Sequence, residues 1–132
     1  MTWVVDPVTQ AELAVPPYAT ARSAIDRAGR PRDGALRSIR FFPDYTVVWP
    51  LWEAGLDEDL SPETLILSEN LWNDIRTWNE EWANDFRHDT GWPTALRRDA
   101  WFNTGDALIE RLQEELWEIA VVTPRFRVYR AV

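Results

Sequence analysis

Two long stretches of helical periodicity do most to limit how this chain can fold. The first begins at Ser68, whose hydroxyl suits a helix N-cap, and runs to about His88. Gly91 and Pro93 follow it and end the helix. Its apolar residues recur at spacings of three and four and fall within an arc of about 80°: Leu71, Ile75, Trp78, Trp82 and Phe86. This stretch predicts an amphipathic helix with one buried face.

The second stretch runs from about Thr94 to Leu116. Its apolar residues fall within an arc of about 120°: Trp101, Phe102, Leu108, Ile109, Leu112 and Leu116. Gly105 lies near the middle of this arc, where glycine costs about 1 kcal/mol of helix propensity relative to alanine. We expect close approach of a neighbouring backbone at Gly105 to offset that cost. The two stretches therefore predict an antiparallel helix hairpin.

Short runs rich in β-branched and aromatic residues flank the two helices. Residues 36–42 predict a strand, and residues 46–49 predict a short extended piece after it. Residues 119–122 and 125–129 predict two more strands. A chain of 132 residues has the length of one domain. We expect an α+β fold, in which a small antiparallel or mixed sheet packs against the two-helix antiparallel hairpin.

The first 35 residues differ from the rest of the chain. They contain four prolines and two glycines, and only residues 18–28 suit a short helix. We expect residues 1–35 to form an irregular N-terminal arm, partly ordered, and residues 36–132 to form a single α+β domain.

The chain offers few groups for catalysis. It has no cysteine and one histidine, His88. Disulfides, thiolate nucleophiles and cysteine zinc sites are therefore excluded, and a Ser-His-Asp arrangement would have to use His88. The sequence contains no glycine-rich phosphate loop, nucleophile elbow or His-x-x-x-His pair. We expect a protein that is not an enzyme, with no cofactor and no metal.

The net charge of -8 limits the choice of partners. Its average field repels nucleic acid and anionic membranes and favours a basic protein. The acidity is concentrated in residues 41–90, which hold twelve acidic residues and two arginines. No run approaches the roughly 20 apolar residues of a membrane span, and the N-terminus lacks the basic start of a secretory leader. We expect a cytoplasmic protein, either a monomer or a homodimer.

Tryptophan is unusually frequent, with nine residues in the chain. We assign those on the two helical arcs to the core. Trp49, Trp52 and Trp92 lie instead in turn-rich sequence. Tryptophan is enriched where proteins bind one another, so a core role and an interface role both stay open for these three.

Acidic and aromatic side chains lie together in two regions where we expect a partner to bind. One is the loop after the first strand, whose acidic tip at residues 57–59 lacks the spacing of a calcium loop. The other is the flank of the first helix, where Asp85 and His88 are three residues apart and could pair. An ordinary solvated loop and flank remain the alternatives. The expected partner-binding residues are Asp44, Tyr45, Trp49, Trp52, Glu53, Asp57, Glu58, Asp59, Glu81, Asp85, His88 and Trp92.

The chain resembles small acidic proteins of actinobacteria over about residues 36–122. Four segments carry the resemblance: Phe42-Pro43-Asp44-Tyr45, Trp49-Pro50-Leu51-Trp52-Glu53, Leu67-Ser68-Glu69-Asn70-Leu71 and Trp78-Asn79-Glu80-Glu81-Trp82. Because those proteins have no assigned activity, the resemblance implies no functional residues. The arm before residue 35 lies outside it.

Three classes of function follow. We favour a protein-binding module, such as a cytoplasmic inhibitor or the immunity partner of a secreted, basic toxin, because the chain is small, acidic and rich in aromatic residues. The first alternative is a self-associating structural or accessory subunit. The second is a small-ligand-binding protein or enzyme that uses Glu81, Asp85 and His88.

Overall fold

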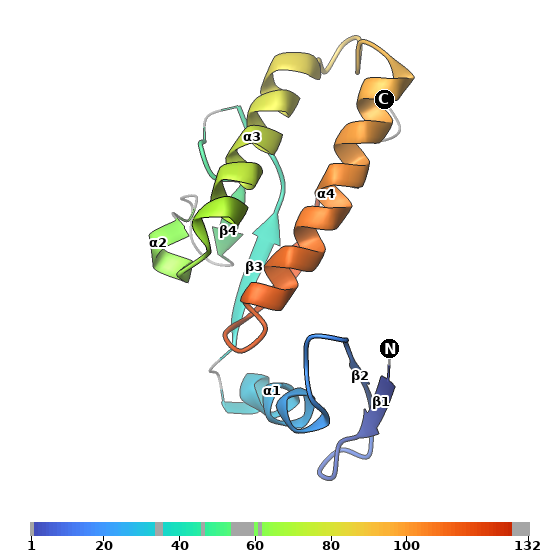
Figure 1. Ribbon diagram of the computed structural model, residues 1–132, viewed down its shortest axis with the longest axis vertical. Helices are drawn as coiled ribbons and strands as arrows, with labels where there is room; N and C mark the ends of the chain where they lie inside the picture. Colours follow the sequence, from blue (N-terminus) through green and yellow to red (C-terminus); the bar gives the residue numbers. More distant parts are fainter. Residues whose placement is uncertain (1, 34–35, 46, 54–59, 61, 128–132) are drawn as a thin grey trace.

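The fold is an α+β arrangement in which two long helices cover a mixed sheet, with a separate β-hairpin and helix at one end (Figure 1). The computed structural model describes residues 2–33, 36–45, 47–53, 60 and 62–127. Its elements are β1 (Thr2–Val5), β2 (Glu12–Val15), α1 (Ala21–Asp33), β3 (Arg37–Phe41), β4 (Leu51–Glu53), α2 (Pro62–Leu65), α3 (Glu69–Asp85), α4 (Ala95–Glu115) and β5 (Ala120–Pro124). The predicted α+β class is confirmed.

Helices α3 and α4 form the predicted antiparallel hairpin. Ser68 caps α3 and Thr94 caps α4, because each hydroxyl accepts a hydrogen bond from the N–H three residues ahead, at 3.4 and 3.1 Å. Helix α3 ends at Phe86, where the backbone becomes extended. Gly91 has a φ of 72°, and its backbone exchanges hydrogen bonds with Arg87. The chain reverses at this glycine because few other residues accept that conformation.

The sheet has the order β4-β3-β5, with β4 antiparallel and β5 parallel to β3. The inward side chains of β3, Ile39 and Phe41, are fully buried under the helices. Residues 47–49, where the sequence predicts a short extended piece, form no strand, since the paired strand begins at Leu51; residue 46 lies outside the described residues. The reason is that the Val47 carbonyl accepts a hydrogen bond from the side chain of Asn79 on α3, at 2.9 Å, instead of one from a neighbouring strand.

The last predicted strand, residues 125–129, is not a strand in the part that the structure describes. Strand β5 ends at Pro124; the Arg125 N–H still donates to the Phe41 carbonyl, at 2.9 Å, but residues 126 and 127 leave the sheet, and residues 128 and 129 lie outside the described residues. The cause is Phe126, whose ring is fully buried and contacts the indole rings of Trp78 and Trp101. Burial of this ring favours a turn into the core over continued pairing.

The N-terminal segment is more ordered than the predicted irregular arm. Strands β1 and β2 form an antiparallel hairpin, and α1 adds 13 helical residues. Buried Asp6 organises the turn, because its carboxylate accepts a hydrogen bond from the N–H of Val8 and its carbonyl accepts one from that of Gln10, both at 2.9 Å. The prolines at positions 7, 16 and 17 lie outside both strands, where they interrupt no pairing.

The core is centred on two tryptophans, one from each long helix. The rings of Trp78 and Trp101 stack with centroids 4.2 Å apart and an angle of 8° between their planes. Each indole N–H donates a hydrogen bond to the backbone carbonyl of the other residue, at 3.0 Å. A Cβ atom on Gly105 would lie 2.9 Å from the rings of Phe126 and Trp78. Gly105 therefore does have close neighbours, but they are side chains, not the neighbouring backbone that we expected.

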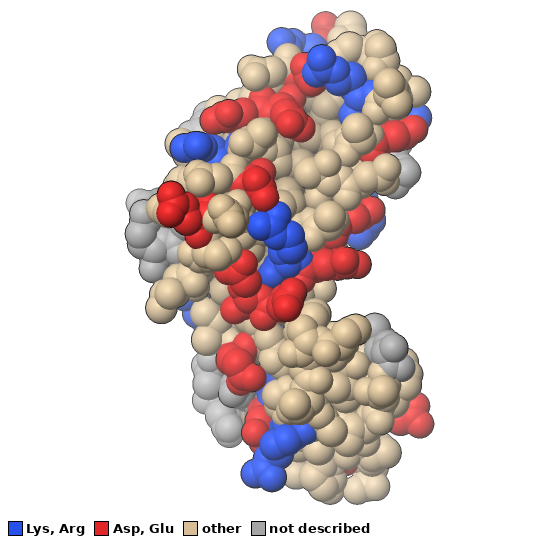
Figure 2. All heavy atoms as spheres, in the orientation of Figure 1, with Lys and Arg blue, Asp and Glu red and all other residues tan. Residues whose placement is uncertain are grey.

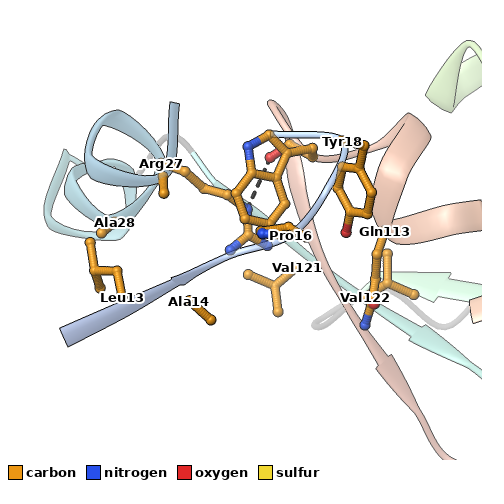
Figure 3. Close-up of a pocket in the computed structure, with 11 residues that line it drawn as sticks. Leu13, Ala14, Pro16, Tyr18, Arg27, Ala28, Gln113, Val121 and Val122 are labelled. Atoms are coloured by element: carbon orange, nitrogen blue, oxygen red, sulfur yellow. Dashed lines mark hydrogen bonds between the residues drawn. The ribbon is translucent and has the colours of Figure 1, made fainter. Parts of the chain in front are cut away.

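The N-terminal segment joins the domain at a hollow of about 450 Å³ lined by residues of β2, α1, α4 and β5 (Figure 3). Arg27 on α1 lies over the ring of Trp117, 4.3 Å from its centroid. Its guanidinium donates hydrogen bonds to the carbonyls of Trp117 and Ala120, at 2.9 and 3.1 Å. The indole of Trp117 donates in turn to Ser23. A few polar contacts around a hollow thus connect the two parts.

Candidate partner-binding surface

A charged groove runs along the outer seam between α3 and α4. It consists of two hollows of about 190 and 290 Å³ that share Glu81 and Thr104. The space exists because α4 presents small side chains there. The groove residues are Asp74, Thr77, Trp78, Glu81 and Asp85 on α3, Trp92 in the turn, and Arg97, Ala100, Trp101, Thr104, Ala107, Leu108 and Arg111 on α4. Figure 2 shows acidic and basic side chains gathered over these two helices.

Two ion pairs cross the groove, one towards each end. Arg97 contacts Asp85 at 2.5 Å, and Arg111 contacts Asp74 at 2.6 Å. Both pairs are partly exposed, so each contributes at most about 1 kcal/mol to stability. The predicted pairing of Asp85 with His88 does not form, because Arg97 from α4 occupies the Asp85 carboxylate.

Glu81 lies between these two ion pairs. No described residue forms an ion pair or a hydrogen bond with its carboxylate. Partial burial raises the pKa of Glu81, the nearby Asp85 carboxylate raises it further, and Arg97 opposes both effects. The middle of the groove therefore holds a negative charge that its surroundings compensate poorly.

His88 and Tyr45 form an aromatic cluster at the end of α3. The Tyr45 ring packs on Trp82 at 4.3 Å, and its hydroxyl donates a hydrogen bond to the Phe86 carbonyl at 2.9 Å. The imidazole of His88 meets the rings of Tyr45 and Phe86 edge-on, at 5.8 and 5.5 Å. Trp92 is half-buried between Phe86 and the core. Tyr45 and His88 remain exposed, so this cluster offers an aromatic surface beside the groove.

Trp49 and Trp52 lie flat against the domain and are half-buried. The Trp49 ring packs on Trp72 at 5.4 Å, and the Arg76 guanidinium lies 5.9 Å from its centroid. Trp52 stacks on Phe42 at 5.0 Å with 7° between the planes, and its N–H donates to the Phe42 carbonyl. Each tryptophan thus buries one face and keeps part of its surface accessible.

The predicted acidic residues of the loop have different surroundings. Asp44 is held through its backbone, which exchanges two hydrogen bonds with the side chain of Asn79. Glu53 forms an ion pair with Arg37 at 2.5 Å, which joins β4 to β3. The hydrogen bond from the Arg37 guanidinium lowers the pKa of the Glu53 carboxyl. Asp57, Glu58 and Asp59 lie outside the described residues.

The lowered pKa of Glu53 leads to a prediction about acid stability. The ion pair contributes fully above the unfolded-state pKa of 4.5 and is lost as the pH falls through the lower folded-state value. We expect Glu53→Gln to reduce the free energy of unfolding by about 1 kcal/mol at pH 7, and by progressively less as the pH falls below 4.5. Urea unfolding at pH 7 and at a series of lower pH values measures this. Glu80→Gln is the control, because its pair with Arg76 is exposed and 3.9 Å long; an equal loss there would contradict the prediction.

The structure brings together only some of the predicted binding residues. Glu81, Asp85 and Trp92 line one hollow, and Tyr45 and His88 lie beside it, whereas Trp52 and Glu53 belong to the sheet. The sequence reasoning missed the residues that α4 contributes. Their signal was the small side chains at positions 100, 104 and 107, which recur at helical spacing and leave room beside α3.

In the part of the chain that the structure describes, no three histidine, aspartate or glutamate side chains gather where they could hold a metal ion. None of the described helices is long and apolar enough to span a membrane.

The fold and the groove define a small α+β protein with a charged, partly aromatic surface suited to another protein. A family model described as Serratia CdiI immunity protein-like matches residues 37–123, and the chain belongs to this family. No curated protein matches it. CdiI-like immunity proteins bind a cognate CdiA toxin protein and inhibit it without catalysis. The predicted protein-binding, immunity-type function is therefore confirmed. The resemblance found in the sequence covers nearly the same residues but had implied no function.

Proposed function

We propose that this protein neutralises a basic toxin by binding it through the groove between α3 and α4 and the aromatic cluster beside it. The observation that carries the proposal is the position of Glu81, which has no ion-pair partner among the described residues and lies between two Arg–Asp pairs. A lysine or arginine of the toxin that entered the groove would compensate this charge. Interfaces are strengthened by such complementarity, and the net charge of -8 would speed the encounter.

The surroundings of Glu81 suit a long basic side chain. Trp92 and Trp101 provide apolar surface beside the carboxylate for the methylene groups of lysine or arginine. Tyr45 and His88 extend the surface past the end of α3. The proposed contact set also keeps Asp44, Trp49, Glu53 and the acidic residues 57–59, the last on the basis of their charge alone. Trp52 is left out of it, because Trp52 lies opposite Arg40 on the face of the sheet that is turned away from the groove.

A charge reversal tests the groove. We expect Glu81→Arg to weaken binding of the cognate toxin by about tenfold or more and to reduce the salt dependence of its association rate. Kinetics on immobilised toxin, with survival of toxin-expressing cells, measure both effects. Glu80→Arg is the matched control, since it makes the same charge change one residue away, outside the groove. Equal losses in the two variants would show that only net charge matters, and no loss in either would exclude the groove.

The Glu81→Gln variant separates the effect of this carboxylate on toxin affinity from its effect on the stability of the free protein. The raised pKa means that the folded protein disfavours the ionised carboxylate, so its removal is expected to stabilise the free protein slightly at pH 7. The same variant is expected to bind the toxin more weakly, and wild-type binding is expected to weaken as the pH falls and Glu81 becomes protonated. Thermal unfolding at pH 7, and affinity followed as the pH is lowered from 7 to the ordinary carboxyl pKa of 4.5, measure the two effects. A parallel loss of stability and affinity would contradict the assignment.

The proposal also includes the domain boundary, the cellular location and the oligomeric state. Residues 36–132 act as the toxin-binding domain and residues 1–35 as an accessory segment, which is supported by a family match that begins at residue 37. A chain that begins at residue 36 is expected to keep the toxin affinity of the full chain, and titration calorimetry measures it. A loss of more than about tenfold would assign toxin contacts to the N-terminal segment.

The protein acts in the cytoplasm, as CdiI immunity proteins typically do, as a monomer or homodimer.

A further inference from the structure

A second charged surface lies on the face of the sheet that α3 and α4 do not cover, behind the helices in Figure 1. Because Ile39 and Phe41 point into the core, strand alternation turns Arg40 and Phe42 to the opposite face. Arg40 lies opposite Trp52 on β4, in the middle of the sheet. Arg125, just after β5, reaches the same place. We call Arg40, Phe42, Trp52 and Arg125 the outer-sheet site.

The two arginines of this site differ from the other arginines with described side chains. The guanidinium of each of these other arginines forms an ion pair with a carboxylate or a hydrogen bond with a carbonyl oxygen. They are Arg22, Arg27, Arg37, Arg76, Arg87, Arg97, Arg98, Arg111 and Arg127. Neither Arg40 nor Arg125 forms a side-chain hydrogen bond or an ion pair with a described residue. In an acidic protein, two adjacent arginines without acceptors are unexpected.

Arg40 also carries a buried hydrogen-bond donor without a partner. Its Nε atom is inaccessible to solvent and has no acceptor among the described residues. A donor in this condition costs about 1–3 kcal/mol relative to one that is satisfied. A ligand that supplied an acceptor at this position would recover that cost.

The shape of the site indicates which acceptor would fit. Arg40, Phe42 and Arg125 line a shallow hollow of about 320 Å³. Trp52 stacks on Phe42, and its hydrogen bond to the Phe42 carbonyl, at 3.2 Å, holds the two rings as a flat wall. Guanidinium groups bind carboxylates in a planar, forked geometry, and the aromatic wall suits the apolar part of the same ligand.

We propose that the outer-sheet site binds an acidic segment of a protein partner, with a carboxylate held between Arg40 and Arg125 and an adjacent apolar side chain packed on Phe42 and Trp52. A nucleic acid or an anionic membrane would set many negative charges against the net charge of -8, whereas a short acidic segment adds only a few, next to the two arginines that compensate them. The site faces away from the groove between α3 and α4 and does not depend on toxin binding there. It gives the protein a basic surface opposite its acidic one.

Capped hexaglutamate is a suitable probe, titrated into the full chain and followed by NMR of the arginine Nε–H and tryptophan Nε1–H groups. We expect saturable shifts at Arg40 and Trp52, and about a tenfold weaker affinity for Arg40→Gln. Arg22→Gln is the matched control, since Arg22 is exposed on α1 and pairs with Asp26. It is expected to bind as the wild type does. Hexaglutamine is expected to give no shift.

Several outcomes would overturn the proposal. These are the absence of shifts at Arg40, equal losses for Arg40→Gln and Arg22→Gln, or binding of inorganic phosphate or a short single-stranded oligonucleotide at least as tight as that of hexaglutamate. If Arg40→Gln does not fold, Arg125→Gln provides the test, because Arg125 is exposed and its loss spares the core. The Glu81→Arg variant is expected to keep hexaglutamate binding, which separates failure of this site from failure of the groove.

Discussion

Replacement of Trp101 by alanine is expected to lower the free energy of unfolding by about 4 kcal/mol, the largest effect of any single change considered for this protein. The Trp101 ring is 2% exposed and stacks on Trp78 at 4.2 Å. The change removes this ring, leaves a cavity between the two helices and takes away the indole N–H that donates a second hydrogen bond to the Trp78 carbonyl. Chemical denaturation followed by circular dichroism measures the loss.

Two further variants are compared with Trp101→Ala. Trp101→Phe keeps an aromatic ring in the stack but removes the N–H, so we expect a smaller loss of about 1–2 kcal/mol. Trp3→Ala changes a tryptophan that is 64% exposed, and we expect it to stay within about 0.5 kcal/mol of the wild type. Equal losses for Trp101→Ala and Trp3→Ala would mean that the stacked pair does not hold the hairpin together.

Gly105→Val is expected to destabilise the protein by about 3 kcal/mol, the second largest effect. Helix propensity alone predicts a gain of less than about 1 kcal/mol, because almost any residue forms helix better than glycine. Packing outweighs that gain, since even a Cβ atom would lie 2.9 Å from the rings of Phe126 and Trp78. Those rings are fixed in the core and have little room to move. Urea unfolding curves measure the balance.

The sign of the stability change in Gly105→Ala decides whether packing or helix propensity dominates at this position. We expect Gly105→Ala to be destabilising as well, by about 1–2 kcal/mol. Asn103→Val, at an exposed position on the same helix, is the control for a β-branched residue in α4 and is expected to fall within about 0.5 kcal/mol of the wild type. A Gly105→Ala protein that is more stable than the wild type would show that the core yields to the added methyl group.

The two proposed binding surfaces differ in the charge they present. In the proposals, the groove offers the carboxylate of Glu81, which pairs with no described residue, to a basic side chain, and the outer-sheet site offers Arg40 and Arg125 to an acidic one. They lie on opposite sides of the same sheet. A partner bound at one surface therefore leaves the other accessible.

The sequence by itself determined the helix hairpin, because its signals are local. Caps such as Ser68 and the apolar spacing of α3 and α4 depend on residues within a few positions along the chain. For the same reason the α+β class and the short strand at β3 could be predicted. The Asp6 turn that orders the N-terminal hairpin is local too, but its signal was weaker than that of the surrounding prolines.

Only the tertiary structure decided which charges meet and which remain free. Asp85 pairs with Arg97 and Asp74 with Arg111 across 12 and 37 residues of sequence, once the packed hairpin brings the helices side by side. The position of β4 was also decided by a tertiary contact, because the side chain of Asn79 on α3 binds the loop that precedes this strand. Helical periodicity reports which face a segment buries but not which neighbour it meets. That Glu81 and Arg40 have no partner among the described residues could therefore be recognised only from the positions of the surrounding side chains in the fold.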